Sequence, residues 1–357
     1  MNFSKIMLFT AFTISVFSSC TNDADVPAAP QPLGAYDNGV LILNQGNFGT
    51  ANSSISYLSD NFSTFQNDVF HIVNPTEILG DTAQDIGLSG NLAYIIVNGS
   101  NKIEIVNRYT LQHIGAITTG LSNPRYIAFA NDKAYVTNWG VAAVTTDDYV
   151  AVINLTTNAI TSTIPVAEGP DRILAKNGNL YVAHLGGYGF GTTISAIDGT
   201  TNVVTPITVG DVPNSLVISG NDLFVISGGK PSWSGTETAG KLTKINTVSN
   251  TVTTTLDFGT TVHPSNLVLS GTNLYYTVDE KVYTIPTTAT ALPTTTLFSA
   301  ASQGVTSIYS FEVRNNKIFV GDAGNYSANG KVYVHSMTGT LEQTYTVGVI
   351  PAGFYFN

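Results

Sequence analysis

Apolar and polar positions follow a pattern that recurs along almost the whole chain. A turn containing Asn, Asp or Gly is followed by Leu, Ile or Ala, and then by an aromatic residue that opens an apolar run. The aromatic residues that mark these copies are Tyr94, Tyr135, Tyr181, Phe224, Tyr275 and Phe319, at intervals of 41 to 51 residues. A further copy at residues 38–43 brings the total to seven. This period is typical of propeller blades and is too long for leucine-rich or ankyrin repeats.

Each copy contains four segments with the character of β-strands. A short run precedes the aromatic strand and is often opened by a proline, as at Pro124, Pro170, Pro213 and Pro264. A third strand and a fourth strand rich in Thr and Val follow the aromatic one, for example at residues 149–153 and 159–166. Tight turns join the first segment to the second and the third to the fourth, and a loop of variable length joins the second to the third, so we expect each copy to form a four-stranded antiparallel sheet.

The second strand of each copy is apolar without alternation, as in Tyr94-Ile95-Ile96-Val97. A strand of this kind is buried on both faces, whereas a flat antiparallel sheet with one face in water would alternate. Burial on both faces is expected when each sheet is packed between two neighbouring blades. The pattern therefore predicts an all-β fold, namely a seven-bladed β-propeller with four antiparallel strands per blade.

The two ends of the repeat region complement each other. Residues 350–356 repeat the motif of a first strand and then stop, while the copy at residues 38–43 begins at the second strand. We therefore predict that the C-terminal strand supplies the innermost strand of the first blade. This arrangement would close the ring and leave no unpaired edge.

The N-terminal segment has the features of an export signal. Residues 6–17 form an apolar run that follows Lys5 and is shorter than the roughly 20 residues a membrane-spanning helix requires. Ser18 and Ser19 then lead into Cys20, which resembles the lipobox of bacterial lipoproteins, where the cysteine is acylated. We predict a lipoprotein-type signal peptide at residues 1–19, a lipidated Cys20 with a flexible linker at 20–35, and the propeller at 36–357.

Composition and charge exclude several classes of protein. The formal net charge is -10, from 14 Lys and Arg against 24 Asp and Glu, and no basic cluster offsets it, which argues against nucleic acid as a partner. A single cysteine cannot form an internal disulfide or a thiolate zinc site.

Asp23 and Asp25, just after Cys20, resemble the acidic export tag of Bacteroidetes lipoproteins. We therefore expect a lipid-anchored, surface-exposed location at the outer membrane.

One copy of the repeat carries a recognisable family motif. Tyr135-Val136-Thr137-Asn138 is the YVTN motif, so the chain resembles the YVTN-repeat, YncE-like bacterial propellers. The segment at residues 43–49, together with the ending at 351–356, resembles a Bacteroidetes subfamily of surface lipoproteins that includes BtuG-like proteins. This resemblance implies capture of cobalamin or a related corrinoid and its transfer to a TonB-dependent outer-membrane transporter.

A candidate binding face follows from the order of strands within a blade. Because tight hairpins join the first and second strands, the segment leading into the first strand and the loop leaving the second lie at the same end of the ring. The loops leaving the second strand are long at residues 44–53, 137–148, 184–193, 227–240 and 321–330. These loops carry isolated aromatic residues, namely Phe48, Trp139, Tyr188, Phe190, Trp233 and Tyr326.

A ring of polar residues is expected inside the circle of these long loops, where the chain enters the innermost strands. Its members are Gln84, Asp85, Arg125, Asp171, Arg172, Asn214, Ser265, Asn266 and Tyr309, and His184 and His263 map to the same face. Aromatic planes around convergent amide, carboxylate and guanidinium groups suit a planar or polyhydroxylated small molecule. An alternative interpretation is that Arg125, Asp171 and Arg172 form a structural set of ion pairs between blades.

The sequence offers no catalytic residue with an activated partner. It contains no HExxH motif, no Gly-x-Ser-x-Gly elbow and no thiol beyond Cys20, so we expect a binding protein without catalytic residues, cofactor or metal. One alternative is a calcium-dependent propeller lactonase or lyase, with Asp85, Asp171, Asp279 and Asp322 as possible ligands. Another alternative is a platform for protein–protein interaction, which would show an extended apolar patch.

Overall fold

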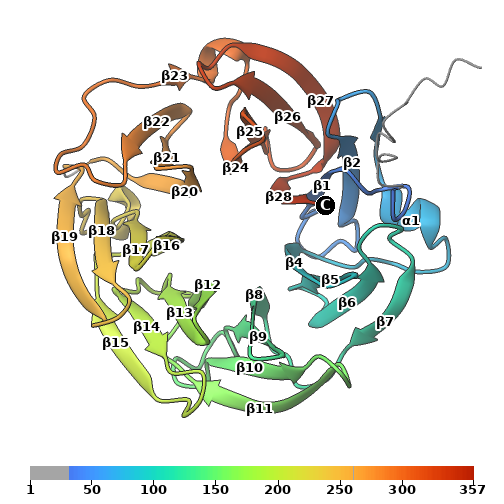
Figure 1. Ribbon diagram of the computed structural model, residues 1–357, viewed down its shortest axis with the longest axis horizontal. Coiled ribbons are helices and arrows are strands. Elements are labelled where there is room, and N and C mark those ends of the chain that lie inside the picture. The colour runs from blue at the N-terminus through green and yellow to red at the C-terminus, as the bar shows by residue number, and fades with distance from the viewer. Residues whose placement is uncertain (1–31, 260) are drawn as a thin grey trace, which may run out of the picture. The chain divides into compact units, whose positions relative to one another are not determined.

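Seven four-stranded antiparallel sheets stand around a common axis in the computed structural model, which describes residues 32–259 and 261–357 (Figure 1). The predicted signal peptide at 1–19, Cys20 and most of the linker at 20–35 lie outside the described residues. Residues Leu33–Asn357 form one compact unit. The predicted seven-bladed propeller with four antiparallel strands per blade is therefore confirmed.

The first four blades are built from strands in chain order, apart from β28. The first blade contains β28 (Pro351–Phe356), β1 (Gly39–Asn44), β2 (Ser54–Ser59) and β3 (Phe65–Gln66). The second contains β4 (Ala83–Ser89), β5 (Leu92–Val97), β6 (Lys102–Asn107) and β7 (His113–Ile117). The third contains β8 (Pro124–Ala130), β9 (Lys133–Asn138), β10 (Tyr149–Asn154) and β11 (Ala159–Pro165). The fourth contains β12 (Pro170–Lys176), β13 (Asn179–His184), β14 (Thr193–Ile197) and β15 (Val204–Thr208).

The remaining three blades repeat the same order. The fifth contains β16 (Pro213–Ser219), β17 (Asp222–Ser227), β18 (Lys241–Asn246) and β19 (Thr251–Asp257). The sixth contains β20 (Pro264–Ser270), β21 (Asn273–Val278), β22 (Lys281–Pro286) and β23 (Phe298–Ser299). The seventh contains β24 (Ile308–Arg314), β25 (Lys317–Asp322), β26 (Asn329–Ser336) and β27 (Leu341–Val349). Three short helical turns interrupt the loops, namely α1 (Val69–Val73), η1 (Ser232–Ser234) and η2 (Ala301–Gln303).

The last strand of the chain closes the ring as the sequence predicts. β28 pairs with β1 in antiparallel register, with Val40 opposite Phe356 and Ile42 opposite Phe354 (Figure 1). Phe354 is buried in a cluster that also contains Phe319 and Val334 of the seventh blade. The first blade therefore combines strands from both ends of the chain, and its innermost strand packs on the preceding blade.

The apolar second strands lie where both of their faces meet neighbouring blades. Tyr94 and Ile96 of β5 pack in one cluster with Ile127 and Val136 of the third blade. Ile95 and Val97, which point to the other face of β5, pack with Leu41 of the first blade. The core is thus divided among the interfaces between blades, which explains why these strands show no alternation.

Connections of unequal length gather at one end of the ring. Within each blade the strands alternate in direction, so the loop from the second to the third strand and the connection to the next blade lie at the same end. We call this end the crown face. Its long loops comprise residues 45–53, 139–148, 185–192, 228–240 and 323–328. At the opposite end most turns are short, apart from residues 287–297.

The connection between β3 and β4 departs from the repeat. Residues 67–82 contain α1, whose Phe70 is 1 % exposed and packs into the core of the first blade. The sequence places His71 in a strand or an edge turn, and this prediction is wrong because His71 lies in α1. The helix has only five residues, so its sequence is too short to show the periodic apolar pattern that predicts a helix. No helix among the described residues is long and apolar enough to cross a membrane.

Candidate ligand-binding face

All seven innermost strands carry a β-bulge near their crown end. In β4, Ala83 pairs with Val97 and Asp85 pairs with Ile96, so Gln84 is an extra residue between them. The corresponding positions in the other blades hold Arg125 and Tyr126, Asp171 and Arg172, Asn214, Asn266 and Leu267, Tyr309, and Ala352. A bulge re-aims side chains out of the regular alternation. Most of the predicted polar ring therefore occupies one irregularity that is repeated around the axis.

Two members of the ring connect blades by hydrogen bonds. Asp85 accepts a hydrogen bond from the backbone N–H of Ile127 at 3.0 Å and another from the Tyr355 hydroxyl at 2.9 Å. Gln84 donates to the Tyr126 hydroxyl at 3.0 Å. Asp85 thus connects the second blade to the third and to β28 in the first, which gives this carboxylate a structural role whatever else it binds.

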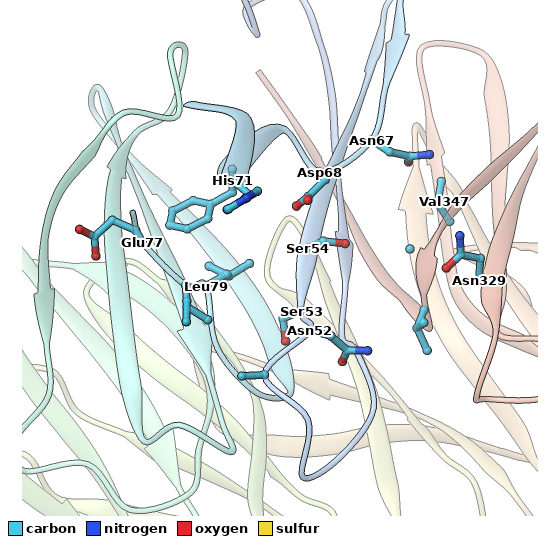
Figure 2. A pocket seen from close by; sticks show the side chains of 15 residues that line it. Asn52, Ser53, Ser54, Asn67, Asp68, His71, Glu77, Leu79, Asn329 and Val347 are labelled. Carbon is cyan, nitrogen blue, oxygen red and sulfur yellow. The ribbon is translucent and has the colours of Figure 1, made fainter. Parts of the chain in front are cut away.

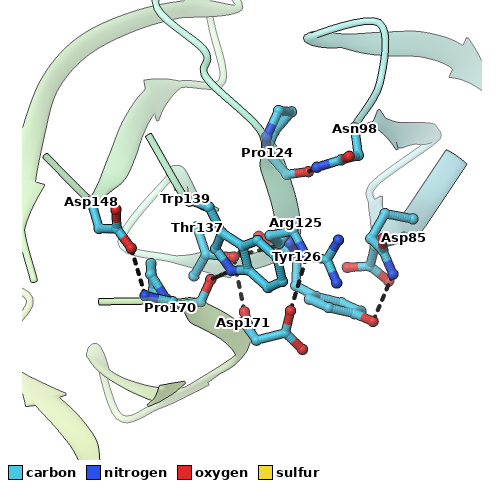
Figure 3. A network of polar contacts seen from close by, with 12 residues as sticks. Asp85, Asn98, Pro124, Arg125, Tyr126, Thr137, Trp139, Asp148, Pro170 and Asp171 are labelled. Atoms are coloured by element: carbon cyan, nitrogen blue, oxygen red, sulfur yellow. Dashed lines mark hydrogen bonds and ion pairs between the residues drawn. The ribbon is translucent and has the colours of Figure 1, made fainter. Parts of the chain in front are cut away.

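An ion pair joins the third and fourth blades beside the first tryptophan. The Nε of Arg125 lies 2.9 Å from Oδ1 of Asp171, and the guanidinium carbon of Arg125 lies 4.1 Å from the centroid of the Trp139 ring (Figure 3). Trp139 in turn donates its indole N–H to the carbonyl of Pro170 at 3.0 Å. The structural ion pair considered from the sequence therefore exists between Arg125 and Asp171, but it does not include Arg172.

Arg172 lies in the bulge of β12 and stacks on an aromatic ring. Its guanidinium carbon is 4.1 Å from the centroid of the Tyr126 ring. It lines a cavity of about 180 Å³ inside the ring of blades, together with Asp85, Asn266, Glu312 and Tyr355. Three members of the predicted polar ring, Asp85, Arg172 and Asn266, line this cavity, and Glu312 and Tyr355 are lining residues that the sequence did not reveal.

Burial changes the acid–base behaviour of the groups in this channel. Desolvation raises the pKa of Asp85, although hydrogen bonds to its carboxylate and the nearby Arg172 oppose the shift. Desolvation also raises the pKa of Glu312 to about 7, against the opposing effects of its hydrogen bond from Val313 and of Arg314 and Arg172. The pKa of Tyr126 rises to about 12, mainly through desolvation. The channel therefore holds a carboxyl group that titrates near neutral pH.

Aromatic side chains from three loops form an arc on the crown face. The rings of Trp139 and Tyr188 are 6.0 Å apart, and those of Phe190 and Trp233 are 5.9 Å apart. Because Tyr188 and Phe190 belong to one loop, the two tryptophans lie at the same end of the ring. Trp233 is 80 % exposed and Tyr188 is 69 % exposed. We call these four residues the aromatic arc.

The other two predicted aromatic residues lie across the ring. Tyr326 is 6.0 Å from Tyr309 between ring centroids, and the Tyr309 hydroxyl donates to Gln45 at 2.6 Å. Asn47 donates its side-chain amide to the carbonyl of Tyr326 at 3.0 Å. Phe48, in the same loop as Asn47, is 85 % exposed. Aromatic groups thus stand on opposite sides of the polar ring.

Several predicted site residues serve the framework. His184 is 1 % exposed, and its Nε2 lies 2.7 Å from the Ser195 hydroxyl, so it does not line the crown surface. Asn214 donates to the carbonyl of Pro264 at 3.0 Å, and Asn266 donates to the Thr277 hydroxyl at 3.0 Å. His263 lies 3.0 Å from Glu237 through its Nε2.

The four carboxylates considered for calcium do not converge. Asp85 and Asp171 are engaged as described above, and Oδ1 of Asp322 accepts backbone N–H groups of Ser307 and Gly324 at 2.9 and 3.0 Å. Asp279 lies next to Glu280 in the short turn before β22, with a positive φ of 51°. No group of three or more His, Cys, Asp or Glu with the geometry of a metal site occurs within residues 32–259 and 261–357.

A larger groove on the rim was not predicted from the sequence. It has a volume of about 500 Å³ and lies beside α1, where the first and seventh blades meet (Figure 2). Polar side chains along it include Asn52, Asp68, His71 and Asn329. The only signal in the sequence is the length of the connection at residues 67–82, because the groove depends on how α1 folds back over the rim.

The fold and the site together define a class of protein: a seven-bladed β-propeller with a polar channel beneath an aromatic arc. The family model described as a domain of unknown function, DUF5074, matches residues 38–350, and the chain belongs to this family. No curated protein matches the sequence significantly.

Solved structures of other propellers resemble this one. A quinonprotein alcohol dehydrogenase-like protein from Bacteroides thetaiotaomicron is 16 % identical and has a TM-score of 0.69, over 90 % of this chain and 78 % of its own. The periplasmic gluconolactonase of Pseudomonas aeruginosa is 13 % identical and has a TM-score of 0.64, over 89 % of this chain and 98 % of its own. At such low identity these similarities establish the propeller fold alone.

Proposed function

We propose that this protein is a lipid-anchored surface protein that binds a small molecule on its crown face. In the most specific form of the proposal, the ligand is cobalamin or a related corrinoid, which passes to a TonB-dependent outer-membrane transporter. The observation that carries the proposal is the aromatic arc, whose Tyr188, Phe190 and Trp233 are exposed and which stands beside the polar ring at the same end of the propeller. The corrinoid itself comes from the resemblance of residues 43–49 and 351–356 to BtuG-like proteins.

The arc offers enough apolar surface for useful affinity. If three aromatic side chains each bury about 100 Å² against a ligand, the gross gain is roughly 7 kcal/mol at about 25 cal/mol per Å². Association costs absorb several kcal/mol of that gain. Polar contacts must therefore contribute as well, and the bulge residues of the innermost strands are the groups placed to make them.

The direction of β1 suits a membrane tether. β1 begins at the end of the ring opposite the crown face, because it is a second strand and runs toward the long loops. Just before it, Tyr36 donates its backbone N–H to the carbonyl of Tyr109 at 2.8 Å, in the turn between β6 and β7. A lipid attached at Cys20 would thus pull on the opposite end, which would leave the crown face open to ligand and transporter.

Titration with cyanocobalamin tests the ligand. The purified protein contains only two tryptophans, Trp139 and Trp233, and both belong to the arc. We expect saturable quenching of their fluorescence, with heat released in a matching calorimetric titration. If micromolar protein with excess cyanocobalamin shows neither signal, the corrinoid is not the ligand.

Paired substitutions in one blade locate the site. Trp233→Ala removes an 80 % exposed ring from the crown face, whereas Val248→Ala changes a 76 % exposed side chain in the turn at the opposite end of the same blade. We expect Trp233→Ala to weaken binding about tenfold or more, corresponding to about 1.4 kcal/mol or more, and Val248→Ala to leave it unchanged. Trp139→Ala should weaken binding too. Equal affinity in all three variants would place the ligand elsewhere.

A further inference from the structure

No acidic side chain of the described residues lies within ion-pair distance of the Arg172 guanidinium, although Asp171, Asp85 and Glu312 are among its charged neighbours. Within the described residues, Arg172 forms neither an ion pair nor a side-chain hydrogen bond, and its plane is held by stacking on Tyr126. The neighbouring carboxylates of Asp171 and Asp85 already form an ion pair or hydrogen bonds with other residues. Asp171 pairs with Arg125, and Asp85 accepts from Tyr355 and Ile127. The N–H donors of the Arg172 side chain therefore make no hydrogen bond to the part of the protein that the structure describes.

These donors share a cavity with room for a ligand group. The cavity has a volume of about 180 Å³, far above the roughly 10–15 Å³ that one water molecule needs. Arg172, Asp85, Glu312, Asn266, Ser215 and Tyr355 are among its lining residues. Arg172 belongs to the bulge at the crown end of β12, so the cavity lies directly below the face that carries the aromatic arc.

We propose that Arg172 anchors a carboxylate group of a ligand in this channel. A guanidinium presents parallel N–H donors that match the two oxygens of a carboxylate, and such bidentate pairs are among the strongest hydrogen bonds in proteins. Stacking on Tyr126 fixes the plane of the fork before the ligand arrives, which lowers the entropy lost on binding. The site deepens the proposed small-molecule function and rests on it, because it assigns an acidic arm to the ligand.

The charges around the cavity favour a carboxylate over a phosphate. Asp85 of β4 and Glu312 of β24 both line the cavity with Arg172. Arg314 lies near Glu312, while Tyr126, Asp171 and Tyr355 lie near Arg172. A dianionic phosphate would meet both carboxylates, whereas a monoanion meets less repulsion. Glu312 has a pKa of about 7, so its protonated form can donate to a ligand carboxylate. Affinity should therefore fall as the pH rises through 7.

Simple anions test the anchor separately from the crown. Acetate, succinate and inorganic phosphate are titrated into the purified protein and followed by calorimetry and by the side-chain ¹⁵N signals of arginine. We expect saturable binding of acetate and succinate, binding of phosphate that is weaker than that of acetate at pH 8.5, where phosphate is a dianion, and a shifted Nε signal from Arg172. Binding at pH 8.5 should be about tenfold weaker than at pH 5.5. No saturable carboxylate binding at either pH would overturn the anchor but would leave the cyanocobalamin titration as an independent test of the crown.

Four variants make the assignment specific. Arg172→Gln should abolish carboxylate binding, and Arg172→Lys, which keeps the charge without the fork, should weaken it. Glu312→Gln should bind carboxylates with little dependence on pH. Val248→Ala should leave succinate affinity unchanged, since Val248 lies in the exposed turn between β18 and β19, outside the cavity. Unchanged affinity in both Arg172 variants, with near-ultraviolet circular dichroism showing native packing, would overturn the proposal.

Discussion

Val40 stands opposite Phe356 in the antiparallel pairing of β1 with β28, so the two ends of the propeller share one sheet. The final residue adds side-chain hydrogen bonds to this pairing. Asn357 donates its amide to the carbonyls of Tyr36 and Arg108 at 2.8 and 2.9 Å, and it accepts from Nε of Arg108 at 2.8 Å. The C-terminus therefore connects the first blade to the second as well as to the seventh.

Removal of residues 351–357 should prevent the ring from closing. Without β28, the first blade loses its innermost strand and β1 is left with an unpaired edge. We expect loss of the native circular dichroism signal and aggregation. A milder change, Phe354→Ala, should lower the free energy of unfolding by about 3–5 kcal/mol, because this ring is 8 % exposed in the closing cluster. Urea denaturation measures the difference, with Val248→Ala as a control within about 0.5 kcal/mol of the parent.

The ion pair between Arg125 and Asp171 should stabilise the protein only as an intact pair. Asp171 is 4 % exposed, so Asp171→Ala leaves the charge of Arg125 without its partner and largely shielded from water. This change should lower the free energy of unfolding by about 3 kcal/mol. Replacing both residues, as Arg125→Met with Asp171→Leu, should cost less than the single change. Chemical denaturation of the three proteins decides between the outcomes. A double variant less stable than Asp171→Ala would mean that the pair contributes more than its desolvation costs.

His184 should make the protein sensitive to acid. Burial lowers its pKa from 6.5 to about 4, so the folded state holds it neutral while the unfolded state takes up a proton. Its contribution is complete above pH 6.5 and is lost as the pH falls toward 4, with a total of about 3 kcal/mol.

His184→Asn should flatten this dependence between pH 6.5 and 4. Asn44 occupies the same position in the first blade and donates to Ser56 at 3.0 Å, as His184 contacts Ser195 in the fourth. Urea unfolding of both proteins across this range measures the slope. An unchanged slope in the variant would show that other groups cause the acid sensitivity.

Glu312 should act in the opposite direction. Its pKa is raised to about 7, so folding favours the protonated carboxyl, and the contribution of this group is complete below about pH 4.5 and lost as the pH rises through 7. Glu312→Gln should therefore be more stable than the parent at pH 8.5 and nearly equal to it at pH 5. Thermal unfolding at both values provides the comparison. A stability difference that is the same at both pH values would contradict a raised pKa.

Much of the fold could be read from the repeat. The marker residues Tyr94 and Phe319 lie on second strands, as their period indicates, and the copy at residues 38–43 does begin at a second strand. The face that carries Trp139 and Trp233 also follows from strand order alone. Residues that break the pattern could not be placed in this way. His184 belongs by sequence to a long crown loop, yet it ends β13 and is buried.

The sequence by itself determined the number of blades, the closure of the ring and the end at which the long loops gather, because these depend on periodicity and on alternating strand direction. The tertiary structure decided which charged groups meet. Arg125 and Arg172 both lie in crown-end bulges of innermost strands, yet Arg125 pairs with Asp171 while Arg172 stacks on Tyr126 beside an open cavity. That difference arises because each bulge aims its side chains at a neighbouring blade, and the distance between blades is set by packing that no local pattern encodes.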